Sequence, residues 1–314
     1  MERPRSITIN GDLGSGKSTV AIELANRLGW RRISMGDIYR QIAQKRGMTA
    51  LQLNRHSERD LNIDAHVDRI QQDLALSDEA MIVDSRLGWH FFADAFKVHL
   101  ITDAAVAAQR VMARPADGVE SYASVEEAEQ RLHERSESER ARFLARYHVD
   151  KARLRNYSLI CDTTRARPEE VASHVIDAFE RYADGELSLL LDPRRLYPTE
   201  QIKNLRGSWE PAGDEFVQKV AATNLNDLTP IRVGYDGHRF FIIDGHRRAS
   251  AALRANLTLI RAELAAEAAE IVVGDLTAGQ FFLAGVQLAT IYDWEAAHDI
   301  TLPLPPHLRQ EVGR

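Results

Sequence analysis

What the chain lacks narrows its identity before any motif is considered. Its 314 residues include one cysteine, Cys161, so an intramolecular disulfide framework and a multi-cysteine zinc site are excluded. No apolar run approaches the roughly 18 residues that a membrane-spanning helix requires. The first five residues lead directly into a strand-like run, without the apolar core of a signal peptide. We therefore expect a cytoplasmic protein with no membrane partner.

The chain also has no excess of positive charge. The formal net charge is −6, from 40 basic and 46 acidic residues, which argues against broad binding to nucleic acid. The hydrophobic content of 44% and the charged content of 27% are ordinary for a globular protein. A chain of 314 residues exceeds one ordinary core and predicts two domains. The expected partners are therefore small molecules rather than nucleic acid.

The first chemical motif runs from Gly11 to Thr19 and fits the phosphate-loop pattern G-x-x-x-x-G-K-[ST]. A β-branched run at 6–10 precedes it, and apolar residues at helical spacing follow it over 18–28. Strand, glycine loop and helix are the context that the motif requires. The residues expected to bind ATP are Gly11, Gly14, Ser15, Gly16, Lys17, Ser18 and Thr19.

The chemistry of such a loop assigns a role to individual side chains. Glycines let the backbone wrap an anion, and the following helix adds its free N–H groups and the positive end of its dipole. Lys17 would reach the β- and γ-phosphates, and the Ser18 hydroxyl would bind Mg²⁺. Asp84 ends a buried strand, where its carboxylate can hold the same Mg²⁺ through water. ATP and Mg²⁺ are therefore the expected cofactors.

Strand-like runs alternate with helical segments through the first half of the chain. This order predicts an α/β fold with a parallel sheet covered by helices on both faces, in a phosphate-loop domain over residues 1–184. The final helix is expected to begin at Pro168. The expected strands lie at 6–10, 30–35, 80–84, 96–101 and 157–162.

Several separate motifs occur in one characteristic order: ITINGDLGSGKST, ISMGDIYRQIAQKRGM, IVDSRLGWHFFADA, RSESERARFLARYHVD and YSLICDTT. Over about residues 5–182 this order resembles the archaeal-type cytidylate kinases, which are phosphate-loop nucleoside monophosphate kinases. The resemblance implies ATP-dependent transfer of the γ-phosphoryl group to a nucleoside monophosphate, CMP or dCMP in type. It also implies that Arg40 and Arg86 hold the acceptor phosphate and that Asp37 touches the acceptor's sugar or base.

The segment 131–146 is unusually rich in charge, and taken alone it is typical of a solvated helix with i,i+4 ion pairs. Its spacing matches the lid motif R-x-x-S-E-x-x-R-[YF]-x-x-x-Y-x-x-D of the resembling family. The resemblance implies that Arg135 and Arg142 act with Lys17 in catalysis, with Arg140 as a further lid arginine. The matching residues are Arg135, Ser138, Glu139, Arg142, Phe143, Tyr147 and Asp150.

One departure from the family's motifs leaves the identity of the phosphoryl acceptor undecided. The family usually has E-G-R-L-A-G-W where this chain has the shorter run from Asp84 to Trp89, DSRLGW. The acceptor pocket lies at this segment, so a phosphate-loop kinase for a small phosphorylated metabolite is the alternative. A further alternative is a nucleotide-responsive regulatory protein, which the intact Lys17 and the lid arginines disfavour.

A second domain is expected over residues 185–314. Two apolar runs at 230–235 and 238–243 flank Asp236-Gly237, which indicates a hairpin, and a helix is expected over 249–255. A glycine turn with two arginines at a helix start is suited to a phosphate or nucleotide. The residues of this predicted anion pocket are Asp244, Gly245, His246, Arg247 and Arg248.

The pieces DPRRLYPTE and LTPIRVGYDGHRFFIIDGHRRASAALRA resemble the ParB/sulfiredoxin-like fold, which implies a smaller α+β domain with a C-terminal helical extension. The sulfiredoxin cysteine is missing beside His246, and no convincing helix-turn-helix follows, so neither sulfiredoxin activity nor DNA segregation is expected. A structural turn whose arginines pair with nearby acids is the alternative to the anion pocket. In that case the domain would serve as a lid or as the surface of a homodimer.

Overall fold

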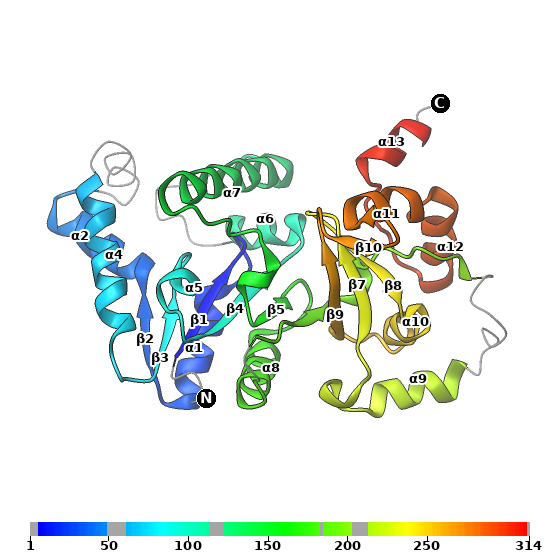
Figure 1. The fold of residues 1–314 in the computed structure, drawn as a ribbon, viewed down its shortest axis with the longest axis horizontal. Coiled ribbons are helices and arrows are strands. Elements are labelled where there is room, and N and C mark those ends of the chain that lie inside the picture. The colour runs from blue at the N-terminus through cyan, green and yellow to red at the C-terminus, as the bar shows by residue number, and fades with distance from the viewer. Residues whose placement is uncertain (1–5, 49–60, 114–121, 183–184, 203–212, 313–314) are drawn as a thin grey trace. The chain divides into compact units, whose positions relative to one another are not determined.

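The computed structural model describes residues 6–48, 61–113, 122–182, 185–202 and 213–312. The chain divides into two compact units, Met1–Glu186 and Leu187–Arg314. The division falls two residues from the boundary expected from the sequence. Figure 1 shows both units.

The described part of the first unit is built on five parallel strands. Central β1 pairs with β3 on one side and with β4 on the other, β2 pairs with β3, and β5 pairs with β4. The sheet order is therefore β2-β3-β1-β4-β5. The strands are β1 (Ile7–Gly11), β2 (Arg31–Ser34), β3 (Met81–Asp84), β4 (Phe96–Ile101) and β5 (Leu159–Asp162).

Helices cover both faces of this sheet, as the alternating pattern predicts. Thr8 and Val83 lie in register, and Thr8 meets Gly88 of α5, while Val83 packs in a cluster that includes Val67 of α4. Helices α1 and α8 pack against each other, and each also contacts strands of the sheet. The helices are α1 (Lys17–Leu28), α2 (Met35–Lys45), α4 (Leu61–Ala75), α5 (Gly88–Phe91), α6 (Ala104–Met112), α7 (Val125–Tyr147) and α8 (Pro168–Glu180).

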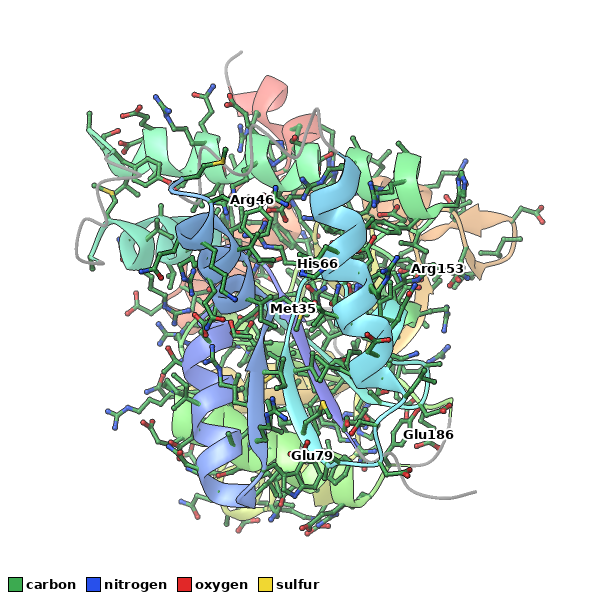
Figure 2. The ribbon with its side chains drawn as sticks, turned by 90° about the vertical axis from the view of Figure 1, so that its left-hand side faces the viewer. Met35, Arg46, His66, Glu79, Arg153 and Glu186 are labelled. Carbon is green, nitrogen blue, oxygen red and sulfur yellow. The ribbon has the colours of Figure 1, made fainter. Side chains whose placement is uncertain are left out.

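The carboxyl ends of the parallel strands lie at one edge of the sheet, where α/β proteins bind ligands. β1 ends at Gly11, where the phosphate loop begins, β2 ends at Ser34 and β3 ends at Asp84. Figure 2 views this unit with β2 and α4 toward the reader and α7 across the top, and Met35 marks the start of α2. Three of the predicted motifs therefore reach the same edge.

The second unit is a smaller α+β body. In it β6 and β9 run antiparallel, β9 and β7 run parallel, and β7 and β8 form the predicted antiparallel hairpin. A short pair, β10 and β11, follows. The elements are β6 (Ser188–Leu191), α9 (Gly213–Ala222), β7 (Ile231–Tyr235), β8 (Phe240–Asp244), α10 (His246–Arg254), β9 (Ile260–Glu267), β10 (Ile271–Val273), β11 (Leu276–Thr277), α11 (Ala278–Gly285), α12 (Leu288–His298) and α13 (Pro306–Val312).

Two details of the second unit differ from expectation or add to it. Helix α10 begins at His246 rather than at Ala249, because Gly245 takes a left-handed conformation, with φ of 97°, directly before it. Trp294 of α12 is fully buried and lies edge-on to the His246 ring. Among the described residues of the whole chain, none of the helices is both long and apolar enough to span a bilayer.

Candidate active site

The phosphate loop has the backbone that its glycines predict. Gly14 and Gly16 both have φ of 81°, a left-handed conformation that side-chain-bearing residues rarely adopt. A Cβ on Gly14 would lie 2.8 Å from atoms of Ala107 in α6. Gly16 is the N-cap residue of α1, so the free N–H groups of the first turn of α1 adjoin the loop. Glycine at these positions therefore lets the loop take a backbone that can cradle an anion, and at Gly14 it also allows close packing against α6.

Lys17 is held inside this loop. Its ammonium donates to the backbone oxygens of Gly11 at 2.8 Å and of Asp12 at 2.9 Å. Burial and the nearby charge of Arg86 lower the pKa of Lys17 to about 8, against the opposing effect of Asp84. The Lys17 ammonium therefore lies in the loop, and its pKa depends on the charges of Arg86 and Asp84.

The predicted metal-binding pair lies together. The Ser18 hydroxyl donates to Oδ2 of Asp84 at 2.7 Å, and Arg32 donates to the same oxygen at 3.0 Å. Arg32 also pairs with Asp37 at 3.2 Å, and Asp37 forms an ion pair with Arg40. A chain of polar contacts thus runs from the metal-binding pair to the residues expected at the acceptor.

These residues fit ATP and Mg²⁺ by their chemistry. The glycine cradle and Lys17 suit a polyphosphate, and a hydroxyl with a carboxylate at its side supplies the oxygen ligands that Mg²⁺ prefers. Lys17, Ser18 and Asp84 are the residues that would hold the metal nucleotide.

Arg86 belongs to a second cluster, which is centred on Glu139 of α7, the helix expected to form the lid. It forms an ion pair with Glu139, whose carboxylate also lies 3.6 Å from Nε of Arg135 and 3.4 Å from Nζ of Lys151. Burial lowers the pKa of Arg86, and the neighbouring charges of Arg135 and Arg142 lower it further against the pull of Glu139. The structure therefore brings Arg86 and Arg135 together on Glu139, with Arg142 near enough for its charge to act on Arg86, whereas Arg40 pairs with Asp37.

Arg140, the further arginine expected in the lid, pairs with a carboxylate that follows α7. It donates two hydrogen bonds to the Asp150 carboxylate, at 2.8 and 2.6 Å, and so ties α7 to the segment that follows it. Arg142 lies over the ring of Phe143, with 5.6 Å between the guanidinium carbon and the ring centroid. In this structure Arg140 thus holds the helix to Asp150, and its expected role as a lid arginine stays a prediction.

The departure at 84–89 also has a structural consequence. Ser85 is buried, and its hydroxyl donates to Oε1 of Gln71 in α4 at 2.6 Å and accepts from the backbone N–H of Leu87. The serine that replaces the family's glycine therefore joins the acceptor segment to α4.

Three further candidate site residues are not indicated by any motif in the sequence. Arg32 and Lys151 carry no motif signal, and only the structure places them on Asp84 and Glu139. Arg110 of α6 donates to the backbone oxygen of Thr163 at 2.6 Å, and the Thr163 hydroxyl in turn donates to the Ser15 oxygen at 2.9 Å. Arg110 is thereby linked to the phosphate loop through Thr163.

Comparison with known proteins agrees with this geometry. The model of the cytidylate kinase-like family matches residues 6–165, about half of the chain. The chain belongs to the cytidylate kinase-like family. It is a phosphotransferase of the nucleoside monophosphate kinase type, and we call Met1–Glu186 the kinase unit.

Three cytidylate kinases illustrate the similarity. That of Natronomonas pharaonis is 40% identical over 182 residues, which are 57% of this chain and 92% of the relative. That of Haloarcula marismortui is 38% identical over 184 residues, 57% of this chain and 92% of the relative. That of Sulfurisphaera tokodaii is 32% identical over 173 residues, 55% of this chain and 93% of the relative.

Outside the kinase unit, the predicted anion pocket is brought together only in part. Arg248 pairs with Asp244 at 2.9 Å, and its Nε is buried without a hydrogen-bond partner among the described residues. Arg247 lies over the ring of Phe216 in α9. Gly245 has no room for a side chain, since a Cβ would lie 2.6 Å from Ile231 and 2.9 Å from Arg248.

His246 does not join these arginines as a cation. It is buried, and its Nε2 accepts a hydrogen bond from the backbone N–H of Thr199 at 3.2 Å, which requires a neutral nitrogen. Burial lowers the pKa of His246 to about 4, although Asp244 opposes the shift. The expectation that His246 belongs to the anion pocket is therefore corrected: its ring is directed to Thr199 in the segment before the hairpin.

The low pKa of His246 predicts a loss of stability in acid. The unfolded chain binds a proton near pH 6.5 and the folded chain near pH 4, so the stabilisation is complete above pH 6.5 and is lost as the pH falls through this window. Between pH 7 and pH 5 the free energy of unfolding should fall by about 2 kcal/mol on this account. Denaturant unfolding at pH 7 and pH 5 measures this difference in the free energy of unfolding. The native protein should show it, and the His246→Gln variant should not.

The matched control for this prediction is His238→Gln, which replaces an exposed histidine of the same unit and should leave the pH dependence unchanged. An NMR titration in which His246 protonates near pH 6.5 would refute the account.

Proposed function

We propose that the kinase unit transfers the γ-phosphoryl group of ATP to the phosphate of a nucleoside monophosphate, with CMP or dCMP as the preferred acceptor. The supporting observation is geometric: Lys17 is held inside the glycine loop, and Arg86, two residues beyond Asp84, forms an ion pair with Glu139 of α7. The charge of Arg86 also contributes to the lowered pKa of Lys17. The names of the similar proteins support cytidine as the base.

The roles of the residues follow from the charges in the reaction. Two phosphate-bearing substrates must approach although they repel each other, so catalysis consists of positioning and charge neutralisation. Lys17 and the first turn of α1 bind the donor's phosphates, and Arg86, Arg135 and Arg142 neutralise charge around the transferred group. Arg40 and Asp37 hold the acceptor. Mg²⁺, held through Ser18 and Asp84, supplies further positive charge to the donor's phosphates.

The lid helix gives a reason for transfer to the acceptor rather than to water. Tyr147 donates to both oxygens of Asp68 in α4 at 3.0 Å, and Arg146 pairs with the same carboxylate at 3.2 Å. Held to α4 in this way, α7 would enclose the reacting groups, and a closed site excludes water.

A screen of acceptors tests this function. The purified chain is mixed with ATP and Mg²⁺ and, in separate reactions, with CMP, dCMP, UMP, AMP and a set of phosphorylated metabolites, and ADP release is followed. We expect kcat/KM to be highest for CMP or dCMP. Faster turnover of a phosphorylated metabolite would instead support the alternative that the DSRLGW segment raises, and ADP release independent of any acceptor would contradict a kinase function.

For the second unit, we propose a ParB/sulfiredoxin-like domain that binds a nucleotide or another phosphorylated small molecule at the start of α10. The support is the left-handed Gly245 before a nine-residue helix, together with Arg247 and Arg248 and the unpartnered Nε of Arg248. The net charge of −6 favours a small phosphorylated ligand over duplex DNA.

Calorimetry on the full chain carrying Lys17→Ala tests this second proposal, because the donor loop is then disabled. We expect ATP, ADP or CTP to bind this variant and the binding to be lost on adding Arg247→Ala and Arg248→Ala, with the fold retained. Arg254→Ala, at the other end of α10, is the matched control and should bind as before. Tight duplex binding with steep salt dependence would favour a regulatory protein, and no binding at all would leave a lid or dimerisation surface.

A further inference from the structure

A buried carboxylate stands where the kinase unit should receive phosphate. The Glu139 side chain is 9% exposed and makes an ion pair with Arg86. Its two oxygens also face Arg135 at 3.6 Å and Lys151 at 3.4 Å. Three cations from three segments of the chain therefore pair with one anion, and the charge of Lys17 acts on it from the loop.

The energetics of this arrangement follow from burial. Burial alone would raise the pKa of Glu139, but Arg86, Lys151 and Arg135 outweigh burial and hold the pKa below its usual range. The carboxylate is therefore ionised, and each of the surrounding cations is partly neutralised. Without this anion, Arg86 would be a buried cation beside Arg135 and Arg142, which is costly.

The proposed transfer reaction gives Glu139 no chemical step. Phosphoryl transfer to a phosphate oxygen needs no proton to be removed, and a carboxylate among transferring phosphates would repel them. A carboxylate in this position must therefore have its role in the substrate-free protein. Two of the cations that pair with it, Arg86 and Arg135, are groups that neutralise phosphate in the proposed reaction.

We propose that Glu139 is a positioning residue: a built-in counter-anion that holds Arg86, Arg135 and Lys151 together until phosphates take its place. This inference rests on the proposed function of the same site. The carboxylate keeps the cations in one cluster and competes with any incoming anion. A substrate pair that carries several charges overcomes this competition, whereas a simple inorganic anion does not.

The test is equilibrium binding of sulfate, without nucleotide or Mg²⁺, to the full chain. Sulfate keeps two negative charges across the neutral range, and its binding requires no catalysis. Glu139→Gln keeps the shape of the side chain and removes its charge. We expect this variant to bind sulfate at least about ten times more tightly than the native protein, while kcat with ATP and CMP falls about tenfold because the arginines lose their anchor.

Glu137→Gln is the matched control, because it makes the same change two residues away on the exposed side of α7. It should leave both sulfate binding and kcat unchanged. Sulfate binding to folded Glu139→Gln that equals or falls below that of the native protein would overturn the proposal, since a merely structural role weakens anion binding or leaves it alone.

Glu139→Asp provides the same test if the glutamine variant does not fold. The shorter carboxylate cannot span Arg86 and Lys151 at once, so sulfate should bind about three times more tightly than to the native protein. Equal or weaker binding would again overturn the proposal. Both results stand apart from the acceptor screen, because sulfate binding does not depend on which acceptor the kinase unit uses.

Discussion

Replacing Lys17 by alanine should lower kcat for phosphoryl transfer by about a hundred- to a thousand-fold or more. The reason is that Lys17 is the loop's ammonium, held 2.8 and 2.9 Å from two backbone oxygens at the place where the β- and γ-phosphates bind. No other side chain of the loop carries positive charge. Steady-state kinetics of ADP release with saturating ATP and CMP measure the effect.

The fold should survive this change. Lys17 sits at the first position of α1, and its hydrogen bonds go to its own loop rather than to the core. Lys17→Met, which keeps most of the aliphatic stem, is the control that separates charge from packing and should be as inactive as the alanine variant. Turnover near that of the native protein in a folded Lys17→Ala variant would remove the basis for a kinase reaction.

Replacing Arg86 by alanine should reduce kcat/KM for the acceptor by about ten- to a hundred-fold, because a charge-assisted hydrogen bond is worth roughly 1.5–3 kcal/mol. Arg40→Ala should act in the same direction, mainly through the acceptor's KM, since Arg40 is exposed and pairs with Asp37 alone among the contacts described above. ATP affinity should change little in either variant. Initial rates at varied CMP, with ATP affinity measured by calorimetry, separate the two effects.

Arg69→Ala, an exposed arginine of α4, is the matched control and should leave the acceptor's kinetics unchanged. A collapse of ATP binding in Arg86→Ala or Arg40→Ala would show that these arginines serve the donor, and the division of roles between donor loop and acceptor segment would then be wrong.

The sequence predicted the donor half of the site well because that half is local. A glycine loop between a strand and a helix fixes its own backbone, so Gly14, Gly16 and Lys17 could be assigned from their spacing. The parallel order of strands then implied that Asp84, at the end of β3, would reach Ser18 at the end of the loop.

The rest of the site depends on contacts between distant segments, which spacing does not encode. Arg32 reaches Asp84 across 52 positions, and Arg86 reaches Glu139 across 53. Glu139 was visible as part of the lid motif, but its neighbours were not. For the same reason the pair that Arg140 makes with Asp150 could not be predicted.

In the second unit the sequence predicted the hairpin and the glycine turn but not the direction of His246. A histidine between a glycine and two arginines resembles part of an anion pocket. The helix, however, begins at His246, which turns the ring toward Trp294 and Thr199 in the core. The direction of a side chain at the start of a helix depends on which residue begins the helix. The expected helix began at Ala249, three residues after the observed start at His246, so the direction of the His246 ring could not be predicted.

The most direct test of the central claim is phosphorus NMR of the products formed from ATP and CMP by the native chain with Mg²⁺. We expect the β-phosphorus resonances of ADP and CDP to grow together in equal amounts, with little inorganic phosphate, because the group moves to the acceptor's phosphate. Inorganic phosphate growing in step with ADP, and no diphosphate on the acceptor, would contradict transfer to a nucleoside monophosphate.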